Sequence, residues 1–130
     1  MDAFDDVKPL DLDEDFLQRV LLELLRIPSP AGRTDVVMQA VGEILEELDL
    51  EVELTRRGAM ITSLPGSGGS ELQRAVVVHT DTIGCMVREL KPNGRLSVVP
   101  VGTHSARFSE GTRVTIFTDE IGHSFTGTIL

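Results

Sequence analysis

The sequence predicts an α/β fold in which an α/β sheet part is followed by a smaller part made of short strands. Three observations predict it: helical periodicity up to residue 48, an apolar β-branched run at residues 75–78, and short strands at regular spacing beyond residue 90. Helices that precede a buried strand indicate a layered α/β architecture rather than a helical bundle. We divide the chain into an acidic leader at residues 1–12, an α/β part at residues 13–90 and a β part at residues 91–130.

Composition and charge exclude several classes of protein. The 130 residues include 12 Lys and Arg against 21 Asp and Glu, for a formal net charge of −9. Nucleic acid is not an expected partner, because phosphate binding needs clustered basic residues. No apolar run approaches the roughly 20 residues that cross a bilayer, so no membrane partner is expected. A single cysteine cannot form a disulfide framework, which favours the cytoplasm.

The negative charge is concentrated in residues 1–15, which hold seven acidic residues and one lysine and run from the leader into the first expected helix. We interpret the leader as a solvated tail, because acidic side chains are favoured at a helix N-terminus. A dedicated acidic docking arm is the alternative.

Two amphipathic helices are predicted before residue 50. Asp11 or Asp13 can cap the first helix, and Pro28 ends it because the residue before a proline avoids the α region. Thr34 or Asp35 can cap the second. Apolar residues recur at helical spacing along both, at Leu17, Val20, Leu21, Leu24 and Leu25 in the first and at Val37, Val41, Ile44, Leu45 and Leu48 in the second.

The period then changes to that of strands. Residues 51–55 and 60–64 are expected to pair around the turn Arg56-Arg57-Gly58, and residues 65–70 form a flexible loop. Residues 75–78 are a continuous apolar run, which is typical of a strand buried on both faces.

The β part continues this pattern without a further helix signal. Strands are predicted at residues 85–90, 96–101, 113–118 and 125–130, with a hairpin turn at Pro92-Asn93-Gly94. This texture is typical of a small barrel or sandwich. The apolar ending suggests that the chain is cut within a longer protein.

The segment His79-Thr80-Asp81 is the candidate site, because it follows the expected buried strand. Ligand sites collect at the carboxyl ends of strands in open α/β sheets. A histidine there can bind a metal, and a carboxylate two residues later can fix its ring orientation. The alternative is a histidine that is hydrogen-bonded to nearby backbone and has only a structural role.

Other chemically reactive residues receive a structural interpretation. Cys85 lies in an apolar strand and is expected to be a small buried hydrophobe. His104 and His123 lie in Gly- and Ser-bearing loops and are expected to be exposed, as are Asp119 and Glu120 at a strand end.

These residues, in this order, resemble the metallo-aminopeptidases of the glutamyl aminopeptidase and tetrahedral aminopeptidase family. The resemblance extends from about Asp13 to the end of the chain and covers roughly the first third of a family member. The matching stretches are Leu25-Arg26-Ile27-Pro28-Ser29-Pro30-Ala31-Gly32, Arg57-Gly58, Val76-Val77-Val78-His79-Thr80-Asp81-Thr82-Ile83-Gly84-Cys85-Met86-Val87 and Asn93-Gly94.

The resemblance implies the N-terminal part of a metallopeptidase α/β sheet domain, followed by the start of a small inserted β-barrel-like domain through which family members dimerise. It implies two divalent metal ions, zinc or cobalt, in the full-length protein. His79 would be a metal ligand, and Asp81 would be the catalytic-site residue that orients His79. The other ligands and the catalytic glutamate would lie beyond residue 130.

Some positions differ from the common family pattern. Thr82 stands where glutamate is frequent, and Ala59 stands where asparagine is frequent. Residues 56–59 and residues 102–108 are similar to a branch linked to the osmoprotectant N-acetylglutaminylglutamine amide. The usual preference for acidic N-terminal residues is therefore in doubt for this chain.

Three hypotheses follow. The first is the N-terminal fragment of a two-metal aminopeptidase that removes N-terminal residues from peptides and is inactive alone. The second is a two-metal deacylase or amidase that acts on an acylated dipeptide osmolyte, and the third is a non-catalytic assembly module. The expected partners are a peptide or small acyl-peptide substrate and further copies of the chain, bound through the β part.

Overall fold

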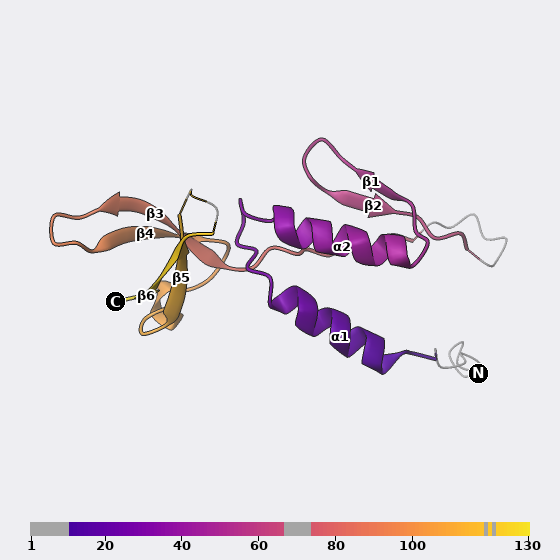
Figure 1. Ribbon diagram of the computed structural model, residues 1–130, viewed down its shortest axis with the longest axis horizontal. Coiled ribbons are helices and arrows are strands. Elements are labelled where there is room, and N and C mark those ends of the chain that lie inside the picture. Colours follow the sequence, from indigo (N-terminus) through magenta and orange to yellow (C-terminus); the bar gives the residue numbers. More distant parts are fainter. Residues whose placement is uncertain (1–10, 67–73, 119, 121) are drawn as a thin grey trace, which may run out of the picture. The chain divides into compact units, whose positions relative to one another are not determined.

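The computed structural model describes residues 11–66, 74–118, 120 and 122–130, so most of the acidic leader lies outside the described residues. The described chain contains both helices and strands, which confirms the α/β content (Figure 1). In chain order the elements are α1 (Glu14–Leu25), α2 (Asp35–Glu47), β1 (Val52–Leu54), β2 (Met60–Thr62), β3 (Gly84–Leu90), β4 (Leu96–Val101), the short 3₁₀ helix η1 (Ala106–Phe108), β5 (Arg113–Phe117) and β6 (Ser124–Thr128). No helix among the described residues is long and apolar enough to span a bilayer.

The chain divides into two compact units. The first comprises Met1–Ser29 and Arg33–Thr80, and the second comprises Pro30–Gly32 and Asp81–Leu130. The division of the sequence at residues 12 and 90 stays a prediction.

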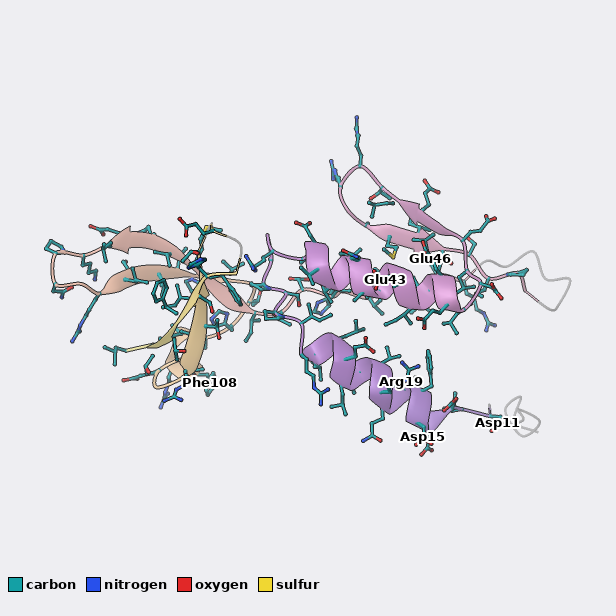
Figure 2. The ribbon with its side chains drawn as sticks, in the orientation of Figure 1. Asp11, Asp15, Arg19, Glu43, Glu46 and Phe108 are labelled. Atoms are coloured by element: carbon teal, nitrogen blue, oxygen red, sulfur yellow. The ribbon has the colours of Figure 1, made fainter. Side chains whose placement is uncertain are left out.

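Both predicted helices are present in the first unit, and their N-termini differ. Asp13 caps α1, and its Oδ1 accepts a hydrogen bond of 2.9 Å from the Phe16 backbone N–H. Thr34 is the N-cap residue of α2, but its side chain makes no capping bond. Charged side chains such as Arg19 on α1 and Glu43 on α2 project from the helices in Figure 2. Within α1, the Arg19 guanidinium forms an ion pair with Glu23, with 3.9 Å between the Arg19 Nη1 and the Glu23 Oε2. The Arg19 Cζ also lies 5.3 Å from the ring centre of Phe16.

The β1–β2 hairpin completes the first unit, as predicted. Its strands pair antiparallel, with Val52 opposite Thr62 and Leu54 opposite Met60. Gly58 supplies the positive φ of 81° that the turn requires. Met60 reaches Gly42 of α2, where an added Cβ would lie 3.3 Å from the Met60 Cε.

Residues 75–78 differ from the prediction of a buried strand, which is wrong for the described chain. They carry no strand assignment, and the side chains of Val76, Val77 and Val78 are 90%, 92% and 82% exposed. The physical reason is the lack of a partner, since no strand among the described residues pairs with this segment. A β-branched run favours extended backbone, but a strand that is buried on both faces requires neighbouring strands and layers packed over both faces of the sheet.

The second unit contains two antiparallel hairpins, and their strands lie within two residues of the predicted bounds. In β3–β4, Gly84 pairs with Val101 and Leu90 pairs with Leu96, with a register shift between Val87 and Glu89. In β5–β6, Arg113 pairs with Thr128. Every sheet among the described residues has two strands, so the described strands do not close a barrel. The helical turn η1 was not predicted, because three residues are too short to show helical periodicity.

Candidate functional site

The candidate segment His79-Thr80-Asp81 connects the exposed valine run to the second unit. His79 is exposed and Asp81 is half-buried. The division between the two units falls between Thr80 and Asp81. These observations do not test the roles of His79 as a metal ligand and of Asp81 as its orienting carboxylate, which stay predictions.

On the first unit's side, the segment is held by a residue of the proline-rich connection after α1. The Ser29 hydroxyl, only 1% exposed, donates a hydrogen bond of 2.9 Å to the Thr80 carbonyl oxygen. The Thr80 hydroxyl in turn donates to the Met38 sulfur of α2 at 3.4 Å. These two bonds hold Thr80, the residue after His79, from the proline-rich connection and from α2.

In the second unit, Pro30 contacts the residues that follow the candidate segment. Pro30 and Thr82 form an isolated parallel β-bridge. The start of β3 lies against the proline, because a Cβ built on Gly84 would lie 2.9 Å from the Pro30 Cβ. The sequence indicated a turned connection here but not these contacts. The available signal was a small polar residue between two prolines.

The described residues do not complete a metal centre by themselves. They contain no group of three or more His, Cys, Asp or Glu side chains placed to hold a metal ion. A catalytic zinc ion usually has about three protein ligands and a water molecule. His79 has the donor type that zinc and cobalt accept, but one such ligand does not fit two metal ions. We therefore derive no hydrolytic step from the described residues.

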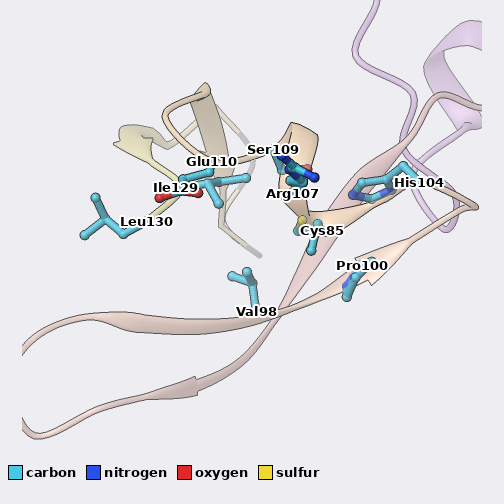
Figure 3. A pocket seen from close by; sticks show the side chains of 10 residues that line it. Cys85, Val98, Pro100, His104, Arg107, Ser109, Glu110, Ile129 and Leu130 are labelled. Atoms are coloured by element: carbon cyan, nitrogen blue, oxygen red, sulfur yellow. The ribbon is translucent and has the colours of Figure 1, made fainter.

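A second place of interest is a cavity of about 510 Å³ within the second unit (Figure 3). Strand residues Cys85, Val98 and Pro100 line it, together with polar residues around η1. The Nδ1 atom of His104 is buried there without a hydrogen-bond partner among the described residues. The remaining lining residues are Ala106, Arg107, Ser109, Glu110, Ile129 and Leu130.

Two expectations for reactive side chains that line this cavity are wrong. Cys85 was expected to be buried, but it is exposed, because β3 belongs to a two-stranded hairpin in which every β3 residue after Gly84 is exposed. His104 was expected to be exposed, but it is half-buried. His123 and Glu120 are exposed as predicted, and Asp119 lies outside the described residues.

Comparison with known proteins identifies the family. Residues 58–130 match the family described as M42 glutamyl aminopeptidase, and this match includes His79 and Asp81. The chain is also 37% identical, over 111 residues, to a Bacillus subtilis (strain 168) protein named "Putative aminopeptidase YhfE". The aligned residues are 85% of this chain and 32% of that relative, so the chain spans about a third of the relative's length. The chain therefore belongs to the M42 glutamyl aminopeptidase family.

Proposed function

We propose that this chain is the N-terminal part of a metal-dependent aminopeptidase that removes N-terminal residues from peptides. The observation that carries the proposal is the family match over residues 58–130, a range that contains the His79-Thr80-Asp81 segment. The relative from Bacillus subtilis supports the same class of activity by its name. Ser29, which donates a hydrogen bond to Thr80 of the segment, lies in one of the stretches that carry the family resemblance.

In this proposal, His79 binds one of two divalent metal ions, zinc or cobalt. Asp81 orients the imidazole by accepting a hydrogen bond from the ring nitrogen that does not face the metal. The other ligands and the general base come from outside the described residues. The metal ions in such a site would polarise the scissile carbonyl group and activate water.

The test uses a chimera in which this chain replaces the corresponding N-terminal segment of the Bacillus subtilis relative. His79→Ala is expected to remove one metal ion and most hydrolysis of aminoacyl-nitroanilides. Asp81→Asn is expected to weaken metal binding by roughly 10- to 100-fold. His123→Ala is the matched control, because His123 is an exposed histidine next to β6.

Metal content and activity of the purified chimeras decide between the outcomes. Unchanged metal content in His79→Ala would contradict the ligand role and favour a structural histidine. The 130-residue chain alone is expected to be inactive, since it offers too few ligands among its described residues. Chelator-sensitive hydrolysis by this chain alone would contradict that part of the proposal.

A second candidate substrate is an acylated dipeptide amide, which a related two-metal deacylase or amidase would cleave. Residues 56–59 and residues 102–108, which are similar to the branch linked to an acylated dipeptide amide, favour it. The same chimera, assayed on both substrate classes, separates the two activities. Activity on neither substrate, with metal retained, would favour a non-catalytic assembly module.

Partners and location complete the proposal. The strands of the second unit would provide the contacts for a homo-oligomer, because their outer edges carry no partner strand among the described residues. The single cysteine and the acidic charge favour the cytoplasm, with no nucleic acid or membrane partner.

A further inference from the structure

The tip of the β3–β4 hairpin carries the one asparagine in the sequence, Asn93, and glycine follows it. Residues 91–95 are exposed. Any loss of side-chain ammonia from an asparagine of these 130 residues must therefore arise at this turn. The hairpin belongs wholly to the second unit.

The turn contains the two groups that react when an asparagine deamidates, the Asn93 side-chain amide and the Gly94 backbone nitrogen. The Asn93 Oδ1 accepts a hydrogen bond of 3.1 Å from the Arg95 backbone N–H, which holds the side-chain amide against its own turn and polarises its carbonyl group. Gly94 has a φ of 77° and no side chain that could shield its backbone nitrogen.

We propose that Asn93 is a site of spontaneous deamidation, with the Gly94 nitrogen as the nucleophile and water as the co-reactant. The Gly94 nitrogen loses its proton and attacks the Asn93 Cγ, and a C–N bond forms as the side-chain amide leaves as ammonia. Water then opens the cyclic imide at one of its two carbonyl carbons. The products are aspartate, or isoaspartate in which the backbone runs through the former side chain.

The folded turn opposes the first step. The Gly94 N–H donates a hydrogen bond of 2.9 Å to the Lys91 carbonyl oxygen, and the Lys91 N–H donates one of 2.8 Å to the Arg95 carbonyl oxygen. The Gly94 nitrogen must leave Lys91 before it attacks, so the reaction proceeds through local opening of the hairpin tip. One net hydrogen bond corresponds to about a fivefold change in such an opening equilibrium.

Modification changes the hairpin itself. Either product adds one negative charge to the formal net charge of −9. Isoaspartate also inserts a methylene group into the backbone between residues 93 and 94. The longer backbone then no longer suits the hydrogen bond between the Lys91 N–H and the Arg95 carbonyl oxygen, whereas ordinary aspartate keeps the backbone length unchanged.

The test incubates the purified chain at mildly alkaline pH, natively and in urea, and maps residue 93 by peptide mass spectrometry with isoaspartate detection. Asn93 is expected to convert in the native chain about fivefold more slowly than in urea. Asn93→Gln is the matched control, because it keeps an exposed amide but would need a larger ring. It is expected to release no ammonia over the same period.

Two results would overturn the inference. One is an unmodified Asn93 in the native chain after the urea-treated chain has fully converted. The other is equal conversion of Asn93 and of the Gln variant. Equal rates in the native and urea-treated chains would contradict the protective role of the Gly94–Lys91 hydrogen bond.

Discussion

At the residue scale, Ser29 links the connection after α1 to the candidate segment. It is 1% exposed, and its hydroxyl donates to the Thr80 carbonyl oxygen. The bond is partly buried, and loss of a typical intramolecular hydrogen bond costs about 0.5–1.5 kcal/mol. Ser29→Ala is therefore expected to lower the free energy of unfolding by that amount. Urea denaturation followed by circular dichroism measures it, since the chain has no Trp or Tyr for fluorescence.

Ser105→Ala is the control for this prediction. Ser105 is exposed and is the N-cap residue of η1, but its side chain makes no capping hydrogen bond. Its replacement is expected to change the free energy of unfolding by less than about 0.5 kcal/mol. An equal loss in both variants would show that the Ser29 hydrogen bond carries no special stability.

The sequence could mark His79 as a candidate but could not predict the hydrogen bond that Ser29 makes to Thr80, and the reason is physical. His79 stands beside an apolar run, so local pattern alone marks it. The Ser29 hydroxyl finds its acceptor 51 residues away in the chain, and no local periodicity encodes such a contact. Likewise, nothing local indicated that the His104 Nδ1 atom would be buried.

At the element scale, the hairpins were predictable because their information is local. Gly58 and Gly94 mark turns whose positive φ suits glycine, and alternating or apolar residues flank both. The exposure of residues 75–78 was not predictable from the sequence, because the burial of a strand depends on its neighbours in the fold rather than on its own composition. The two helices lie between these cases: Asp13 fixed the start of α1 locally, while its leucine stripe remains largely exposed.

The contact between β3 and the proline-rich connection gives a prediction at this scale. A Cβ at Gly84 would lie 2.9 Å from the Pro30 Cβ, and a proline ring carbon cannot rotate away. Gly84→Ala is therefore expected to cost about 1–3 kcal/mol through overpacking. The measurement is again urea denaturation followed by circular dichroism.

Gly127→Ala is the matched variant in β6. Its added Cβ would meet the Ile116 Cδ1 at the same 2.9 Å, but that methyl group ends a flexible side chain and can move. A smaller loss than in Gly84→Ala is expected. If Gly127→Ala proves the more destabilising of the two, the Pro30 contact does not limit the position of β3.

At the scale of the whole molecule, apolar surface dominates over core. Among the described residues, Val37 is the buried apolar side chain, at 2% exposure, whereas many large apolar side chains are exposed on both units. Domains of this size usually bury roughly two-thirds of the surface of the unfolded chain. Exposed apolar surface of this kind is typical of an interface. The net charge of −9 opposes association, so the balance between the two depends on ionic strength.

This balance leads to the expectation that the 130-residue chain self-associates, through antiparallel pairing of residues 75–78 with the same residues of a second copy. Extended β-branched segments without a partner strand are templates for such pairing, and a two-fold axis brings identical segments together. Sedimentation at several protein concentrations should detect the dimer, with stronger association at higher salt as repulsion is screened. Val77→Lys places a charge in the pairing segment, at a side chain that is 92% exposed, and should weaken the association. Val36→Lys, on an exposed position of α2, should leave association unchanged. A wild-type chain that stays monomeric and melts cooperatively would contradict this prediction and would indicate that residues 75–78 need no partner strand.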